Sequence, residues 1–206
     1  MHRATSDVDT VVEEGDPPGA VNVLLRMDGT EADPESDHRV WVQGTKVEVI
    51  HVGPVDDSDL AGIPEKDALF VASHAWALQT AVPCTLVAEA DSVVRTIAPV
   101  ATPAALVAMK LHAIEDRRPS RAQDKRAGDA WDIYRLLVDC DANGAVRGAL
   151  GGAPPIFRGL VRVAAERILV SGAERTRGWL RAGGDEMAAA TADELRFVGQ
   201  QLVAAL

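Results

Sequence analysis

The stretch RATSDVDTVV, residues 3–12, decides the fold of the first half of the chain. From Asp7 onward polar and apolar side chains begin to alternate, and this period of two is typical of a β-strand with one polar face. Side chains two residues apart on a strand share a face, so Asp7 and Asp9 align with Thr5, while Val8 points to the other side. Two carboxylates roughly 7 Å apart on one strand repel each other unless a cation lies between them.

Strand-type runs separated by turn residues continue up to about residue 100. Gln43-Gly44-Thr45 lies between two of these runs and is typical of a hairpin turn. We expect strands at 7–12, 38–42, 46–52, 84–87 and 93–97, short helices at 21–27 and 68–80, and polar loops at 28–37 and 56–66.

The second half of the chain has helical periodicity instead. Thr102 followed by Pro103 is a good N-cap with proline in the first turn, and it predicts a helix that continues to about Asp116. We expect further helices at 122–138, 155–170, 173–180 and 185–206. The predicted fold class is therefore α/β (α+β), with an α/β core over residues 1–100 and a C-terminal helical bundle over residues 101–206.

Composition excludes several classes of protein. The 206 residues are 47% hydrophobic, which is enough for a core and argues against a disordered chain. Two cysteines, Cys84 and Cys140, are too few for a disulfide framework or a cysteine zinc site and fit a reducing cytoplasm. The sequence has no apolar run long enough to cross a bilayer. It also has no Walker A motif, dinucleotide-binding glycine fingerprint or nucleophile elbow.

Charge is distributed unevenly along the chain. The net charge of −10 argues against non-specific coating of nucleic acid, because Lys and Arg supply that affinity. Residues 1–100 contain 18 acidic and 6 basic residues, whereas residues 101–206 contain 13 acidic and 15 basic residues. Two interpretations remain open: an ordinary acidic protein with an exposed charged helix–loop–helix, or a chain that holds cations in one half and polyanions in the other.

Carboxylates from two strands form the first candidate site. Glu48 lies in the strand-type run KVEVI, on the face opposite to Val47 and Val49. A third carboxylate from a neighbouring strand would complete a trio with Asp7 and Asp9. Oxygen ligands of this kind suit Mg²⁺. The alternative is a plain amphipathic strand whose polar face is wet.

A lysine and two aspartates form the second candidate site. Lys110 lies among apolar residues, so its stem is partly packed and its ammonium could bind a phosphate. Lys125, Asp129 and Asp132 fall at i, i+4 and i+7 on one face of the following helix. The alternative is a helix with an internal Lys–Asp pair and an aromatic core edge.

The order of these features resembles that of the AbiEii/AbiGii-type nucleotidyltransferase toxins, the MenT-like group, over about residues 3–138. RATSDVD at 3–9 resembles their R-x-[ST]-x-D-h-D strand, and KVEV at 46–49 resembles the following strand with its third acid. ATPAAL at 101–106, continuing through Lys110 to Arg117, resembles the helix with the family lysine. DAWDIYRLL at 129–137 resembles the D-x-x-D-[IL]-x-x-L helix.

This resemblance implies a nucleotidyltransferase fold, in which a small mixed sheet holds the carboxylates and a helical domain closes the nucleotide cleft. The implied reaction is transfer of a nucleoside monophosphate from an NTP to an acceptor, in this group of toxins the 3′ end of tRNA. The implied partners are an NTP, an RNA acceptor and a cognate antitoxin protein, and the implied cofactor is Mg²⁺.

The resemblance also implies a role for each matching residue. Asp7 and Asp9 would bind Mg²⁺, joined by Glu48 at a position where aspartate is commoner. Lys110 would neutralise triphosphate charge, and Asp132, supported by Asp129, would complete the site. Phosphorylation of Thr5 would block the metal. The implied catalytic residues are Asp7, Asp9, Lys110 and Asp132, the metal ligands are Asp7, Asp9 and Glu48, and the substrate-binding residues are Arg3, Thr5, Ser6, Arg117 and Asp129.

One part of the family pattern is missing. The pattern carries Gly-Gly or Gly-Ser at the end of a helix before the D-x-D strand, and only four residues precede Thr5. We expect either that the true start lies upstream or that the chain is a decayed member, and that nucleotide binding by these 206 residues is impaired. Two further functions fit the same residues: a catalytically silent domain that binds an antitoxin or RNA, and a small-molecule nucleotidyltransferase.

Overall fold

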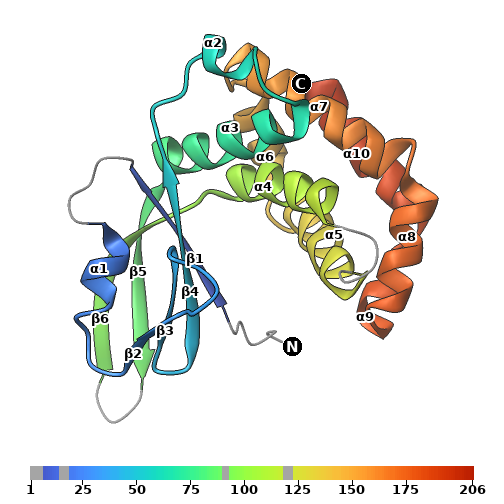
Figure 1. Ribbon diagram of the computed structural model, residues 1–206. Helices are drawn as coiled ribbons and strands as arrows, with labels where there is room; N and C mark the ends of the chain where they lie inside the picture. The colour runs from blue at the N-terminus through green and yellow to red at the C-terminus, as the bar shows by residue number, and fades with distance from the viewer. Residues whose placement is uncertain (1–6, 14–18, 90–92, 118–122) are drawn as a thin grey trace. The chain divides into compact units, whose positions relative to one another are not determined.

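The computed structural model describes residues 7–13, 19–89, 93–117 and 123–206. The protein is a mixed α+β structure with two small sheets and many helices, as the sequence predicts (Figure 1). It divides into two compact units, Met1–Val55 and Asp56–Leu206. The division therefore falls after Val55, whereas we expected a join near residue 100. The reason is that the helix Glu65–Thr80 packs against later helices. Among the described residues, the strands Val82–Glu89 and Val93–Val100 pair with each other and not with the sheet of the first half.

The first unit is built on a four-stranded mixed sheet. Its elements are β1 (Asp7–Glu13), α1 (Ala20–Leu24), β2 (Thr30–Ala32), β3 (Arg39–Val42) and β4 (Thr45–Val52). The strand order is β1-β4-β3-β2; β1 runs parallel to β4, and the other neighbours are antiparallel. Strand β2 lies in the segment 28–37 that we expected to be a loop. Its three residues lack an alternating pattern, and pairing with β3 makes them a strand.

A two-residue turn fixes how β3 and β4 pair. Gln43 and Gly44 have φ angles of 49° and 80°, so both have the positive φ of a type I′ hairpin turn. This turn places Val42 opposite Thr45 and, further along the two strands, Arg39 opposite Glu48. The hairpin predicted at this position is confirmed.

The two faces of this sheet differ in burial. Val40 and Val49 are almost fully buried, with exposed fractions of 0% and 1%, and α1 packs against β3. Cross-strand partners share a face, so the row Asp9–Glu48–Arg39 lies on the face opposite to Val40. The pattern of polar and apolar residues in β4 therefore gives the sheet one apolar face and one charged face.

The second unit is mostly helical. Helix α3 packs against α4 and α7, α4 packs against α5, and α5 packs against α8. Strands β5 and β6 pair only with each other in the described part of the chain. The elements are α2 (Asp57–Leu60), α3 (Glu65–Thr80), β5 (Val82–Glu89), β6 (Val93–Val100), α4 (Pro103–Asp116), α5 (Gln123–Val138), η1 (Ala142–Gly144), α6 (Ala145–Gly151), α7 (Pro155–Ala165), η2 (Glu166–Val170), α8 (Ala173–Ala182), α9 (Asp185–Ala188) and α10 (Ala192–Ala205).

Local capping signals set several of these boundaries. The Thr102 hydroxyl accepts a hydrogen bond from the Ala105 amide at 3.3 Å, and α4 begins at Pro103 as predicted. The single helix predicted over 185–206 is wrong, because Thr191 and Glu194 form a capping box that starts the separate helix α10. Among the described residues, no helix is both long and apolar enough to cross a bilayer.

Candidate functional site

The first group of candidate residues lies on the charged face of the four-stranded sheet. Asp9 on β1 is in register with Glu48 on the parallel strand β4, and Asp7 is in register with Lys46. A third acid on the strand beside the D-x-D strand is what the sequence predicts. The side chain of Asp7 lies outside the described part of the structure, as do Arg3, Thr5 and Ser6.

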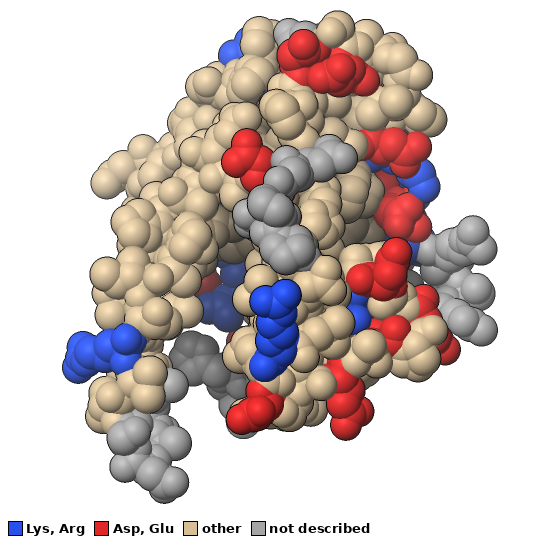
Figure 2. Space-filling view, turned by 60° about the vertical axis from the view of Figure 1, so that its left-hand side comes forward, with Lys and Arg blue, Asp and Glu red and all other residues tan. Residues whose placement is uncertain are grey.

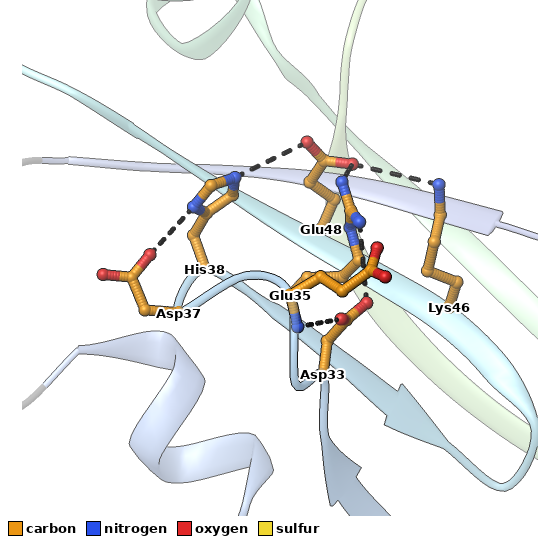
Figure 3. Close-up of polar contacts among 7 residues, drawn as sticks. Asp33, Glu35, Asp37, His38, Lys46 and Glu48 are labelled. Carbon is orange, nitrogen blue, oxygen red and sulfur yellow. Dashed lines mark hydrogen bonds and ion pairs between the residues drawn. The ribbon is translucent and has the colours of Figure 1, made fainter.

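Basic side chains surround the carboxylate of Glu48 (Figure 3). Arg39 Nη2 lies 3.5 Å from Glu48 Oε2, and Lys46 Nζ lies 3.9 Å from the same oxygen. His38 Nε2 lies 3.9 Å from Glu48 Oε1. The Glu48 side chain is 27% exposed, so it is partly withdrawn from water and its charge is compensated by these neighbours.

Further acids hold the same basic residues from the β2–β3 loop. Arg39 Nη1 lies 3.5 Å from Asp33 Oδ2, and the Asp33 side chain is only 8% exposed. Asp33 Oδ1 also accepts a hydrogen bond from the Glu35 amide at 2.8 Å, which fixes the loop. His38 Nδ1 lies 3.1 Å from the exposed carboxylate of Asp37. We call Arg39, Lys46 and Glu48, with Asp33 behind them, the sheet cluster.

The donor atoms on this face determine whether it could bind a metal ion. Carboxylate oxygens suit Mg²⁺, and Asp9 on β1 supplies one such side chain. Glu48 is a poor fit as a ligand, because Arg39 and Lys46 lie near its Oε2 and would repel a metal ion there. Among the described residues, no group of three or more His, Cys, Asp or Glu side chains has the geometry of a metal site. Asp9 is therefore the described carboxylate on this face that best suits a metal ion, and Asp7 stays a predicted ligand.

The second group of candidate residues links α4 to α5. Lys110 Nζ on α4 lies 3.1 Å from Asp129 Oδ1 and 2.7 Å from Asp132 Oδ2 on α5. Arg117 Nε, directly after α4, donates to the other oxygen of Asp129 at 2.7 Å. Asp129 is the buried centre of this group with 7% of its side chain exposed, whereas Asp132 is 46% exposed. We call Lys110, Arg117, Asp129 and Asp132 the helix cluster.

Two opposing effects act on the pKa of Lys110. Burial favours the neutral amine and would lower the pKa, but the hydrogen bond to Asp132 and the charges of both aspartates favour the ammonium. The net result is a pKa raised above the ordinary lysine value. Lys110 is therefore a cation at every physiological pH, as a phosphate-binding residue must be.

Arg126 on α5 and Arg175 on α8 have partners within the second unit. The Arg126 guanidinium lies over the Trp179 ring, 5.5 Å from its centroid, and Arg175 lies at 5.3 Å from the same centroid. Arg126 also donates to the Arg117 carbonyl.

On the face drawn in Figure 2, acidic and basic side chains form small separate groups within a mostly uncharged surface.

Sequence reasoning identified some of these residues and missed others. It identified Asp9 beside Glu48, and Lys110 with Asp129 and Asp132. It predicted no role for Arg39 or for Lys46. Counting back from the Gln43-Gly44 turn places Arg39 opposite Glu48, so the pairing could have been predicted.

Comparison with known proteins adds no further candidate residues, since no family model, curated protein or solved structure matches the chain.

Proposed function

We propose that this protein is a nucleotidyltransferase that transfers a nucleoside monophosphate from an NTP to an RNA acceptor, the 3′ end of tRNA, as the toxin of a toxin–antitoxin pair. One observation carries the proposal: Lys110 lies between Asp129 and Asp132, at distances of 3.1 and 2.7 Å. These three residues come from two separate sequence motifs of the resemblance and meet where α4 packs against α5. The parallel pairing of β1 with β4 in a small mixed sheet agrees with the fold that the resemblance implies.

The proposed reaction forms one bond and breaks another. The oxygen of the acceptor hydroxyl attacks the α-phosphorus of the NTP, the bond from that phosphorus to the bridging oxygen breaks, and pyrophosphate leaves with the electron pair. The hydroxyl proton passes to a carboxylate or to solvent. A divalent ion bound with the nucleotide supplies charge stabilisation, and Asp7 and Asp9 would hold it.

Lys110 would contribute positive charge to the phosphate chain. An ammonium has three N–H donors, and the two aspartates account for two of them. The Lys110 side chain is 31% exposed, so a third donor can reach a phosphate oxygen. Asp129 and Asp132 act as positioning residues for this ammonium, because they fix its location before substrate arrives.

The test is transfer of radiolabel from each of the four NTPs to purified tRNA in the presence of Mg²⁺. We expect incorporation from at least one NTP, with a loss on the order of 10²-fold or more in Asp9→Asn and in Lys110→Met. Glu13→Gln is the matched control for Asp9→Asn, because it removes an exposed carboxylate from the same strand. No incorporation into any RNA from any NTP would contradict the proposal.

A second function is favoured by the surroundings of Glu48. Arg39 and Lys46 compensate the acid that the resemblance assigns to the metal, as expected if the domain is catalytically silent and binds an antitoxin or RNA. Calorimetry separates the two functions. Mg²⁺-dependent NTP binding that Asp9→Asn abolishes supports the transferase, whereas RNA or antitoxin binding without NTP affinity supports the silent domain.

A further inference from the structure

We propose that Arg39 and Lys46 form a binding site for the phosphate chain of the nucleotide, and that Glu48 is their counter-ion and not a metal ligand. The class of ligand rests on the proposed function. The site itself rests on the contacts of the sheet cluster, which lies entirely within the first unit.

The contacts of Glu48 are those of a counter-ion. Its Oε2 lies 3.5 Å from Arg39 and 3.9 Å from Lys46, and its Oε1 lies 3.9 Å from His38. A metal ligand needs an oxygen directed at a dication, and here each oxygen already has a basic group near it (Figure 3). Glu48 therefore supplies negative charge to its basic neighbours.

The strand register places these cations close to Asp9. Glu48 lies between Asp9 on β1 and Arg39 on β3, in a row that crosses three neighbouring strands. Adjacent strands are about 4.8 Å apart, so the backbone of Arg39 is roughly 10 Å from that of Asp9. Lys46 is one strand from the Asp7 position. Phosphates bound at the D-x-D strand would therefore extend toward two cations.

Arg39 is held loosely enough to accept a ligand. Both Arg39 ion pairs measure 3.5 Å, which is the outer limit of a hydrogen bond. Arg39 Nε is buried and has no hydrogen-bond partner among the described residues. A guanidinium has five N–H donors in a planar fork that matches phosphate, so Arg39 has donors to spare. Phosphate oxygens can replace Glu48 at Arg39 and Lys46 with shorter hydrogen bonds.

The first experiment measures binding of inorganic pyrophosphate by calorimetry in EDTA, which removes any metal. We expect Lys46→Met and Arg39→Gln each to weaken binding by on the order of 10-fold. Arg26→Gln is the matched control, because Arg26 is an exposed arginine of the same unit. Arg39→Lys covers the case in which Arg39→Gln does not fold, and it should weaken binding less than Lys46→Met. Wild-type affinity in both Lys46→Met and the Arg39 variants would overturn the site.

The second experiment tests the role of Glu48. In EDTA, Glu48→Gln should tighten pyrophosphate binding about 5-fold, because the counter-ion no longer competes, and the gain should be smaller when Lys46→Met is added, since only Arg39 is then released. Titration with MnCl₂ should show a loss of about 5-fold or less in Glu48→Gln, the size of a through-space charge effect, against roughly 30-fold or more in Asp9→Asn. Equal Mn²⁺ losses in the two variants would overturn the assignment of Glu48.

These outcomes are separable from those of the proposed function. If the variants weaken pyrophosphate binding as expected but no nucleotide transfer occurs, the phosphate site is supported and the proposed transferase activity is not. If nucleotide transfer occurs and pyrophosphate binding is unchanged in the Arg39 and Lys46 variants, the transferase is supported and the phosphate site is not. Absence of pyrophosphate binding by the wild-type chain overturns the phosphate site directly.

Discussion

The carboxylate of Asp129 accepts a hydrogen bond from Lys110 at 3.1 Å while only 7% of its side chain is exposed. Its second oxygen accepts a hydrogen bond from Arg117 at 2.7 Å, so this one buried carboxylate pairs with two cations. Asp132 also pairs with Lys110 but is 46% exposed. The two aspartates of this motif therefore differ in their contribution to stability, although they carry the same charge.

Asp129→Asn should destabilise the fold far more than Asp132→Asn. Removing the Asp129 charge leaves Lys110 and Arg117 short of a buried partner, which costs about 3 kcal/mol. Removing the half-exposed Asp132 charge costs about 1 kcal/mol or less, as for a surface ion pair. Urea unfolding of the two variants measures the difference. Equal losses of free energy would mean that Asp129 is not the centre of the cluster.

His112 should make the protein less stable in mild acid. Burial lowers its pKa; Asp116 and Asp67 oppose that effect, while His74 and Lys66 add to it. Below the ordinary histidine pKa the unfolded chain takes up a proton that the folded protein resists, so stability falls as the pH drops. The contribution of His112 is fully present above about pH 6.5 and is lost as the pH falls through the lowered folded pKa.

The measurement is the change in urea midpoint between about pH 7.5 and pH 5. His112→Gln should show a smaller change than the wild-type protein, because it removes one group that protonates on unfolding. His112 also packs against Phe70 in a tilted arrangement with ring centroids 5.0 Å apart, so the variant loses some stability at every pH. The pH dependence is therefore compared, not the absolute stability, and identical midpoint changes would exclude His112 as its source.

Local patterns predicted most of the elements, because caps and alternation act over a few residues. The Thr102-Pro103 start of α4 and the hairpin at Gln43 are of this kind. Strand β2 was missed because its pairing with β3 depends on a partner eight residues or more away, and no local signal marks it. The assignment of β5 and β6 to the first-half core failed for the same reason, since only tertiary packing decides which sheet a strand joins.

The candidate residues that lie in sequence motifs could be predicted from the sequence. The resemblance placed Lys110 with Asp132, whereas helical spacing related Asp132 only to Asp129 and Lys125; the observed Lys110–Asp132 distance of 2.7 Å fits the resemblance. The partners of Glu48 were not predicted, although Lys46 lies two residues away on the same strand and the place of Arg39 follows from the β3–β4 turn. A carboxylate in a motif looks the same in sequence whether its neighbour is a metal or an arginine, and only the fold distinguishes the two.

A close helix contact predicts opposite effects for two glycines. A Cβ at Gly199 on α10 would lie 2.6 Å from Leu169 Cβ, and Leu169 is fully buried in η2. Gly199→Ala should therefore destabilise by about 1–3 kcal/mol. At Gly178 within α8, no described atom lies within 4 Å of the added carbon, so Gly178→Ala should stabilise by about 0.5–1 kcal/mol. Thermal unfolding measures both, and a stabilised Gly199→Ala would contradict the close contact.

The β3–β4 turn should control the sheet cluster. Gly44 has a φ of 80°, where a Cβ costs roughly 1–2 kcal/mol, so Gly44→Ala should destabilise the hairpin. Gln43 has a φ of 49°, a conformation that asparagine tolerates better, so Gln43→Asn should stabilise by a few tenths of a kcal/mol, about 0.5 at most. Because this turn sets Arg39 opposite Glu48, Gly44→Ala should also weaken pyrophosphate binding, whereas Gln43→Asn should not. A folded Gly44→Ala variant with wild-type affinity would show that the cluster does not depend on this register.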